Sequence, residues 1–322
     1  MTTTTLDVGT VVEAAAARVA EHYVFPEIGA ELAALLRRRS TDGAYGAVGP
    51  EELAEAVTAD LQSVNGDLHL RLKHHAEPVP ADGEGQKGAA AMTAMRRRFD
   101  AGLGGVPRVE LLEGGVALLE VAPAMFPLEW AAQPLAAALT LVAPASALIL
   151  DLRRNTGGDP DTVAFICGYL LDRRTHLNTL LSQQGAVAEQ FWTPPHVPGA
   201  RFGGRKPLYV LTSGRTFSAG EELAYDLQQL GRAPVVGEVT GGGAHPREGW
   251  TVHPHLEVSV PVARALNPVS GTNWEGVGVE PDVPCAAEEA LDVALALALE
   301  NLALENLASQ NPARHGSPDA GR

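Results

Sequence analysis

Ser218 is the residue of this chain best placed to act as a nucleophile. It follows an apolar run, Leu208 to Leu211, that is typical of a buried strand, and a short Ser/Gly turn. Leu223, Leu227 and Leu230 then recur at helical spacing, which predicts a helix that begins just after the serine. A strand-to-helix turn exposes the hydroxyl, and the free N–H groups of the helix can stabilise an oxyanion. Serine is also a preferred helix N-cap, so the position alone fits either role.

A second glycine turn has the same design. Residues Ala147 to Leu152 are typical of a strand, Asn155 to Gly158 form a tight loop, and Pro160 suits the first turn of a helix. Gly157 and Gly158 would allow backbone N–H groups to approach a ligand closely, although a Gly-Gly pair is by itself only a turn. Two such strand–turn–helix units would direct two helix N-termini at one crevice.

Both turns belong to an ordered series of motifs. The series comprises Tyr23-Val-Phe-Pro26, Gly66-Asp-Leu-His-Leu-Arg71, Asp151-Leu-Arg-Arg-Asn-Thr-Gly-Gly158, Thr216-Phe-Ser-Ala219, Val236-Gly-Glu238, Gly241-Gly-Gly-Ala-His-Pro246 and Asn267-Pro-Val-Ser-Gly-Thr-Asn-Trp-Glu-Gly-Val-Gly-Val-Glu-Pro-Asp282. In this order it resembles the tail-specific (C-terminal-processing) serine peptidase family, in the branch related to the repeats of interphotoreceptor retinoid-binding protein. The resemblance implies a ClpP/crotonase-like α/β core of βα units after a small helical bundle. It also implies that Ser218 is the nucleophile and that the N–H groups of Ala219 and of Gly157 or Gly158 hold the oxyanion.

The chain departs from most members of that family at the catalytic base. They use a Ser–Lys dyad, whereas Gly243 stands where the lysine would follow the Gly-Glu-x-Thr segment. The chain contains only three lysines, Lys73, Lys87 and Lys206, and none is expected beside the serine. A lysine base is therefore not expected here.

The tricorn-like relatives use histidine and glutamate instead. His69, in Gly66-Asp-Leu-His69, resembles their histidine, and Glu275 resembles their glutamate before a Gly-Val-x-Pro-Asp segment. A serine needs a base, histidine titrates near neutral pH, and a carboxylate can orient the ring or hold a water. Leu68 replaces the serine that precedes the histidine in those enzymes. His245, two residues after the lost lysine position, is the alternative base.

We therefore expect a serine peptidase, a hydrolase that acts on peptides or exposed protein chain ends, with a peptide or unfolded protein as its substrate and without a metal or cofactor. The alternative is a non-catalytic binder of apolar, retinoid- or lipid-like ligands, and a small-substrate esterase or amidase is a third reading. The joint presence of Ser218, His69 and Glu275 favours the enzyme. About 45 residues separate His69 from the strand at Val116, too few for a PDZ domain, so the cleft itself is expected to select the substrate.

Composition excludes several other classes. The formal net charge of -15 argues against nucleic acid and anionic membranes as partners. Cys167 and Cys285 are too few for a disulfide framework, and no ligand cluster suggests zinc. The N-terminus lacks the pattern of a signal peptide, and the apolar stretches are broken by charges, which predicts a cytoplasmic protein. The abundance of arginine and alanine is typical of a GC-rich bacterium.

The apolar patterns predict three parts. Residues 1–75 form a helical domain, residues 76–308 form the α/β catalytic domain, and residues 309–322 form a disordered tail. The predicted helices are Val11–His22, Pro26–Arg39, Pro50–Gln62, Ala89–Arg98, Leu128–Val142 and Ala286–Ala308, and the further strands are Val116–Val121, Val235–Val239 and Leu256–Val262. The polar segment Pro78–Gly88 is interpreted as a linker or mobile loop. The predicted last helix has a stripe of apolar residues, which could pack in the core or form the contact of a homo-oligomer.

Overall fold

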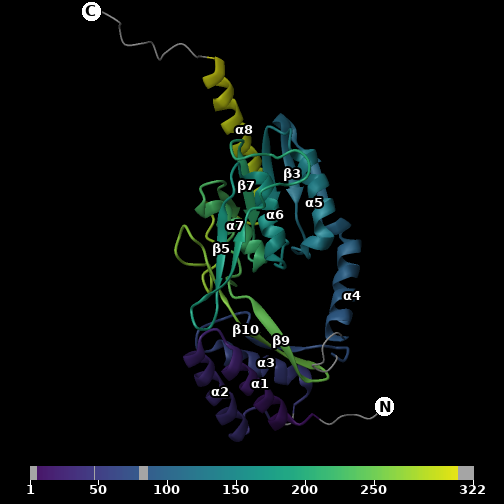
Figure 1. Ribbon diagram of the computed structural model, residues 1–322, viewed down its shortest axis with the longest axis vertical. Coiled ribbons are helices and arrows are strands. Elements are labelled where there is room, and N and C mark those ends of the chain that lie inside the picture. Colours follow the sequence, from purple (N-terminus) through teal and green to yellow (C-terminus); the bar gives the residue numbers. More distant parts are fainter. Residues whose placement is uncertain (1–5, 47, 80–85, 311–322) are drawn as a thin grey trace, which may run out of the picture.

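The computed structural model describes residues 6–46, 48–79 and 86–310. It is elongated, with a helical unit at one end, a larger sheet-containing unit at the other, and the last helix projecting beyond it (Figure 1). The elements are α1 (Val8–His22), α2 (Pro26–Thr41), α3 (Pro50–Gln62), β1 (Arg71–His74), α4 (Gln86–Ala101), β2 (Arg108–Leu111), β3 (Val116–Glu120), α5 (Leu128–Val142), β4 (Ala147–Asp151), α6 (Pro160–Leu170), β5 (His176–Leu181), β6 (Val187–Trp192), β7 (Leu208–Thr212), α7 (Ala219–Gln229), β8 (Val235–Gly237), β9 (Arg247–His253), β10 (Leu256–Pro261), β11 (Arg264–Leu266), β12 (Val283–Pro284) and α8 (Ala290–Gln310). Short 3-10 turns, η1 (Leu103–Gly105) and η2 (Glu113–Gly115), flank β2.

A six-stranded sheet organises the larger unit, in the order β12-β8-β7-β4-β3-β2. Its strands pair in parallel except for β2, which runs antiparallel to β3. The strands β3, β4 and β7 are buried along their whole length, because helices cover both faces of the sheet. The expected α/β class, with a helical N-terminal region, is confirmed.

The two faces of this sheet carry separate apolar cores. Leu119, Leu150 and Val210 pack in the core that includes residues of α5, α6 and α7. The alternate residues of the strands pack in a second core with Ala290 and Ala298 of α8, as the period of two in a strand requires. None of the described helices is long and apolar enough to cross a membrane.

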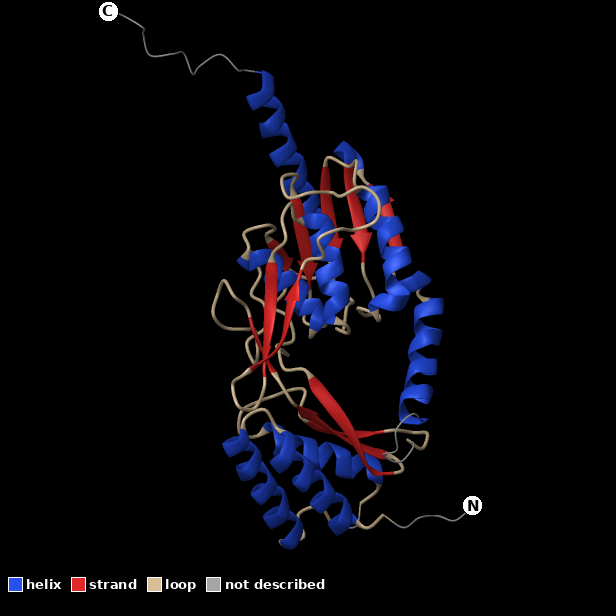
Figure 2. Cartoon of the chain, in the orientation of Figure 1, coloured by secondary structure: helices blue, strands red, loops and turns tan. Residues whose placement is uncertain are grey.

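The helical unit includes a hairpin from much later in the chain. Strand β1 pairs with β10, and β10 pairs with β9, so the three strands form a sheet of their own. Leu256, Val258 and Val260 of β10 are buried in the same core as the apolar residues of α1, α2 and α3, and Figure 2 shows this sheet lying against the helices. The single boundary at residue 75 therefore left out the hairpin of residues 247–261.

Two expected segments lie largely outside the described residues. Most of the predicted Pro78–Gly88 loop falls in residues 80–85, and the predicted tail falls almost entirely in residues 311–322. The chain between His69 and Val116 forms β1, α4 and β2 in its described part.

Candidate active site

Ser218 lies at the turn between β7 and α7, where its backbone adopts φ 51° and ψ −123°. A positive φ is unusual for a residue with a side chain, and such strain persists only where the surrounding structure enforces it. The fold holds Ser218 from both sides, because the N–H of Phe217 donates to the carbonyl of Asn155 at 3.1 Å and the N–H of Ser218 donates to the Glu221 carboxylate at 2.7 Å. Ser218 is also the N-cap residue of α7, where it forms a capping box with Glu221.

Glu221 ties the serine turn to the glycine-rich loop. Its buried carboxylate accepts the N–H of Ser218, the N–H groups of Gly242 and Gly243 at 2.6 and 2.9 Å, and the hydroxyl of Thr240 at 2.5 Å. Burial raises the pKa of Glu221, although these hydrogen bonds act in the opposite direction. Four donors on one buried carboxylate fix the distance between the two loops.

The Asn155–Gly158 loop lies directly against Ser218. A Cβ atom built on Gly157 would lie 2.6 Å from the Ser218 Cβ, so only glycine allows this approach. The N–H of Gly157 is already used, because it donates to Asn155 Oδ1 at 2.9 Å. The N–H groups of Gly158 and Ala219 have no hydrogen-bond partner in the part of the chain that the structure describes. Of the three predicted oxyanion donors, these two N–H groups are available. Gly157 is not an available donor, but its lack of a side chain lets the loop lie against Ser218.

The ring of His69 lies beside this turn. It is 8% exposed, and its centroid is 4.7 Å from that of the Phe217 ring. The main chain of His69 is held at both ends, because its N–H donates to Asp67 Oδ1 at 3.0 Å and its carbonyl accepts the Ser259 hydroxyl at 2.8 Å. Neither ring nitrogen has a hydrogen-bond partner among the described residues, and Nδ1 is buried. Burial lowers the pKa of His69 to about 4, which keeps the imidazole neutral and able to accept a proton.

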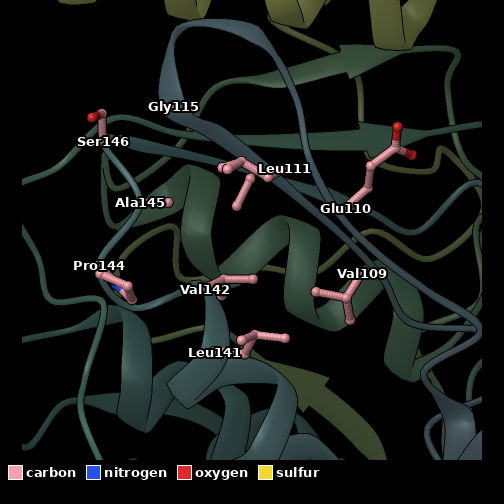
Figure 3. Close-up of a pocket in the computed structure, with 10 residues that line it drawn as sticks. Val109, Glu110, Leu111, Gly115, Leu141, Val142, Pro144, Ala145 and Ser146 are labelled. Atoms are coloured by element: carbon pink, nitrogen blue, oxygen red, sulfur yellow. The ribbon is translucent and has the colours of Figure 1, made fainter.

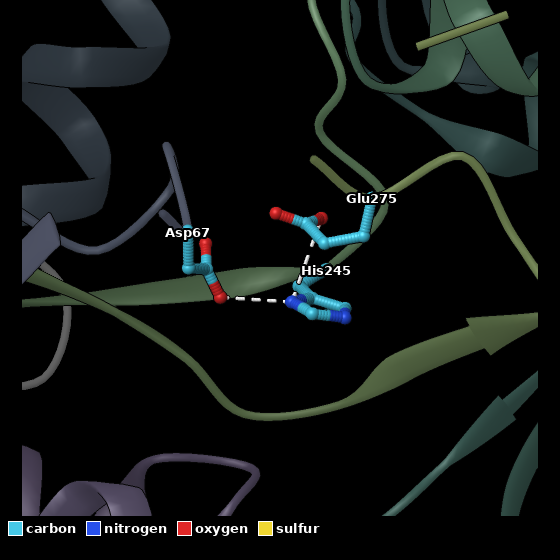
Figure 4. A group of neighbouring side chains, drawn as sticks. All are labelled: Asp67, His245 and Glu275. Atoms are coloured by element: carbon cyan, nitrogen blue, oxygen red, sulfur yellow. Dashed lines mark hydrogen bonds and ion pairs between the residues drawn. The ribbon is translucent and has the colours of Figure 1, made fainter. Parts of the chain in front are cut away.

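His245 lies in a separate buried cluster with two carboxylates (Figure 4). Its Nδ1 is 2.8 Å from Asp67 Oδ2 and 3.5 Å from Glu275 Oε2. Asp67 also accepts the Tyr23 hydroxyl at 3.0 Å, and Glu275 accepts the N–H of Ala244 at 2.5 Å. Burial opposes ionisation of Asp67, but the hydrogen bond and charge of His245 hold the pKa of its carboxyl below the ordinary value. Burial raises the pKa of Glu275 to about 7.

This cluster could offer one nitrogen and two oxygen ligands to a metal, since one ligand atom from each residue lies within 4.8 Å of the others. The direct 2.8 Å contact between His245 and Asp67 already satisfies the ring nitrogen and one carboxylate oxygen. A bound metal would have to replace that hydrogen bond, although Oε1 of Glu275 is buried without a hydrogen-bond partner among the described residues.

The structure thus divides the predicted residues into two groups. Ser218, Ala219 and the Gly157–Gly158 pair meet at one point, with His69 beside the adjoining Phe217. Glu275 contacts His245 and not the His69 ring, and Asp67 links the two histidines. Asp67 was not predicted as a site residue, although it belongs to the Gly66–Arg71 motif. Its position two residues before His69 could have indicated a role beside the proposed base.

Two family models match the chain. One describes peptidase family S41 and matches residues 126–285, and the other describes the N-terminal domain of Peptidase_S41 in eukaryotic IRBP and matches residues 2–99. The first covers both strand–turn–helix units and Glu275, and the second covers His69. The resemblance inferred from the motifs is confirmed.

Solved structures share the fold. A photosystem II D1 C-terminal processing protease is 17% identical, with 91% of this chain and 98% of that chain covered and a TM-score of 0.55. A putative peptidase from Parabacteroides merdae is 18% identical, with coverages of 91% and 96% and a TM-score of 0.63. The tricorn protease is 12% identical, with 92% of this chain but 37% of that chain covered and a TM-score of 0.57.

Proposed function

The chain belongs to peptidase family S41 and is a serine peptidase, and we propose that it cleaves peptides or unfolded chain ends with Ser218 as nucleophile. The observation that carries the proposal is the meeting of a strained serine at a helix N-terminus with two backbone donors that have no partner among the described residues. The Ser218 Oγ would attack the scissile carbonyl carbon, and the N–H groups of Ala219 and Gly158 would donate to the oxygen as it becomes an oxyanion. The strain at Ser218 is consistent with a site that is held ready before substrate arrives.

His69 is the proposed general base. It would accept the hydroxyl proton of Ser218 on an unpartnered ring nitrogen and return it to the leaving amine. Its ring contacts Phe217, the residue next to the nucleophile, whereas Nδ1 of His245 is held by Asp67. The absence of a hydrogen bond from Ser218 to His69 in the free protein does not oppose the assignment, because such contacts often tighten only when substrate binds.

Glu275 is proposed to support the site indirectly. It anchors the N–H of Ala244 and lies next to His245, which in turn holds Asp67. Asp67 binds the main-chain N–H of His69. This chain of contacts makes Glu275 and Asp67 positioning residues for the base.

The substrate is proposed to be selected without reading its terminal carboxylate. Of the two arginines that could have read it, Arg153 binds Asp151 and the carbonyl of Ala287. Arg71 donates to the carbonyl of Leu68 through one terminal nitrogen, and its buried Nε has no partner among the described residues. A peptide and its C-terminally amidated form should therefore be cleaved with similar kcat/KM. A large loss on amidation would contradict this part of the proposal.

The experiment is covalent labelling with a fluorophosphonate probe, together with hydrolysis of a library of unstructured peptides. Wild type and Ser63→Ala, which changes an exposed serine of the helical unit, should both react, whereas Ser218→Ala should neither label nor cleave. Equal labelling of wild type and Ser218→Ala would overturn the nucleophile. Failure of folded wild type to label or cleave, with tight binding of an apolar ligand, would favour the binding-protein alternative.

A further inference from the structure

Strand β2 forms a free edge of the six-stranded sheet. Among the strands of the described residues it is the last in the sheet order, and β3 is its single partner. All four of its residues, Arg108 to Leu111, are exposed. An open edge presents unpaired backbone groups to any strand that can align with it, so a protein must either block it or use it.

The free backbone groups of this edge belong to Val109 and Leu111. The N–H of Leu112 donates to the carbonyl of Val116 across the turn to β3. Because backbone groups alternate in direction along an antiparallel strand, Glu110 and Arg108 also direct theirs toward β3. The N–H and carbonyl groups of the two residues between them therefore point away from the sheet.

The same two residues give the edge an apolar face. Val109 is 36% exposed and Leu111 is 73% exposed, and Leu141 at the end of α5 is 68% exposed. Together with Val142 and Pro144 they line a pocket of about 450 Å³ (Figure 3). A cluster of exposed aliphatic side chains beside an open strand edge is typical of an interaction surface.

The charges on β2 indicate which partner fits. Arg108 and Glu110 lie on the other face of the strand, two residues apart, and form an ion pair with each other within one copy. In an antiparallel pair, two residues that face each other both direct their N–H and carbonyl groups either toward the partner strand or away from it. A second copy of β2 can therefore align in only a few registers. Pairing about Val109 sets Arg108 opposite the second copy's Glu110 twice, whereas pairing about Glu110 sets two glutamates face to face.

We propose that two copies of this protein associate through β2, antiparallel about a twofold axis at Val109. Val109 then hydrogen bonds with its own symmetry mate, and the sheet continues across the interface. Because facing residues point to the same side, Val109 and Leu111 of both copies form one apolar strip next to the two α5 helices. The strand is short and charged, as protected edges often are, but its opposite charges stand at a self-complementary spacing.

Sedimentation velocity of the full chain over a range of concentrations tests the proposal. Wild type should form a dimer that dissociates on dilution. Arg108→Glu and Glu110→Arg each place like charges at both contacts, and each should raise the dimer dissociation constant roughly tenfold or more. The double variant R108E/E110R restores opposite charges and should dimerise like wild type. Thermal melting monitored by circular dichroism checks that all variants are folded.

Mixing the two single variants tests the register itself. R108E carries two glutamates on the strand and E110R carries two arginines. An equimolar mixture should therefore form a heterodimer, under conditions where neither variant forms a homodimer. Val109→Pro is a second test, because proline is tolerated where an edge N–H faces solvent but cannot pair, and it should abolish the dimer. A monomeric wild type at every concentration, or single variants that dimerise as tightly as wild type, would overturn the proposal. Peptidase activity plays no part in these readouts.

Discussion

Gly243 lies so close to the ring of His69 that there is no room between them for a side chain on residue 243. A Cβ atom built on Gly243 would lie 2.6 Å from His69 Cε1 and 2.3 Å from Phe217 Cζ. By its resemblance to the family, Gly243 matches the position of the catalytic lysine in most members. We infer that the His69 ring occupies space that a side chain at this position would need.

Gly243→Ala should reduce kcat at least about tenfold, because the rings of His69 and Phe217 must move to admit the methyl group. The rings are the far ends of side chains, so the loss of stability should be smaller than that of a core overpacking. Gly214→Ala is the matched control, since a Cβ there meets nothing closer than 3.9 Å, and it should keep wild-type kcat. A fully active Gly243→Ala would contradict the role of this contact.

The strain at Ser218 predicts that the nucleophile costs stability. Ser218→Gly should have a free energy of unfolding about 1 kcal/mol above that of Ser218→Ala, because glycine adopts φ 51° without strain. Both variants lack the hydroxyl and should be inactive, so only stability separates them. Urea unfolding of the two inactive variants measures the difference. If the alanine variant is as stable as the glycine variant, the turn is not strained.

Burial of two titratable groups predicts opposite pH effects on stability. The pKa of His69 is lowered to about 4, so its contribution is complete above the unfolded value of about 6.5 and is lost as pH falls toward 4, by about 3 kcal/mol in total. The pKa of Glu275 is raised to about 7, so its contribution is complete below the unfolded value and is lost as pH rises through 7. The two effects oppose each other between about pH 4.5 and 6.5.

Single variants separate these effects. Between about pH 4.5 and 6.5, Glu275→Gln removes the glutamate effect, so the slope of its stability against pH should be more positive than that of wild type. His69→Gln removes the histidine effect, so its slope should be more negative than that of wild type over the same interval. Denaturant unfolding at several pH values gives the slopes, and two variants whose slopes change in the same direction would contradict the assigned shifts.

Helices with a clear local pattern of apolar residues were predicted correctly from the sequence. The bounds of α3 and α5 agree with the predicted helices, because each has apolar residues at helical spacing between clear start and stop positions. Strands β6 and β9 were not predicted, since most of their residues are exposed or half-buried. They exist because neighbouring strands pair with them, and pairing between distant segments is not visible in local periodicity.

The candidate site shows the same limit. The turns at Ser218 and Gly157–Gly158 were predictable, because each lies where a strand passes through glycine or serine into a helix. The contact between Asp67 and His245 joins residues 178 positions apart, and no spacing rule indicates it. Glu275 was expected to support His69 but contacts His245, since the loop that carries it packs on the glycine-rich loop through Ala244.

Asp67 is predicted to position the base and to tune it. Asp67→Asn should lower kcat about 10- to 100-fold with little change in KM, because the carboxylate that holds the His69 N–H and the His245 ring is weakened at both contacts. The charge of Asp67 raises the pKa of His69, and that of His245 lowers it. Asp67→Asn should therefore shift the acid limb of the kcat/KM profile to lower pH, and His245→Gln should shift it to higher pH. A purely structural role would reduce activity in both variants without moving the limb, so unchanged pH profiles would contradict the assignment.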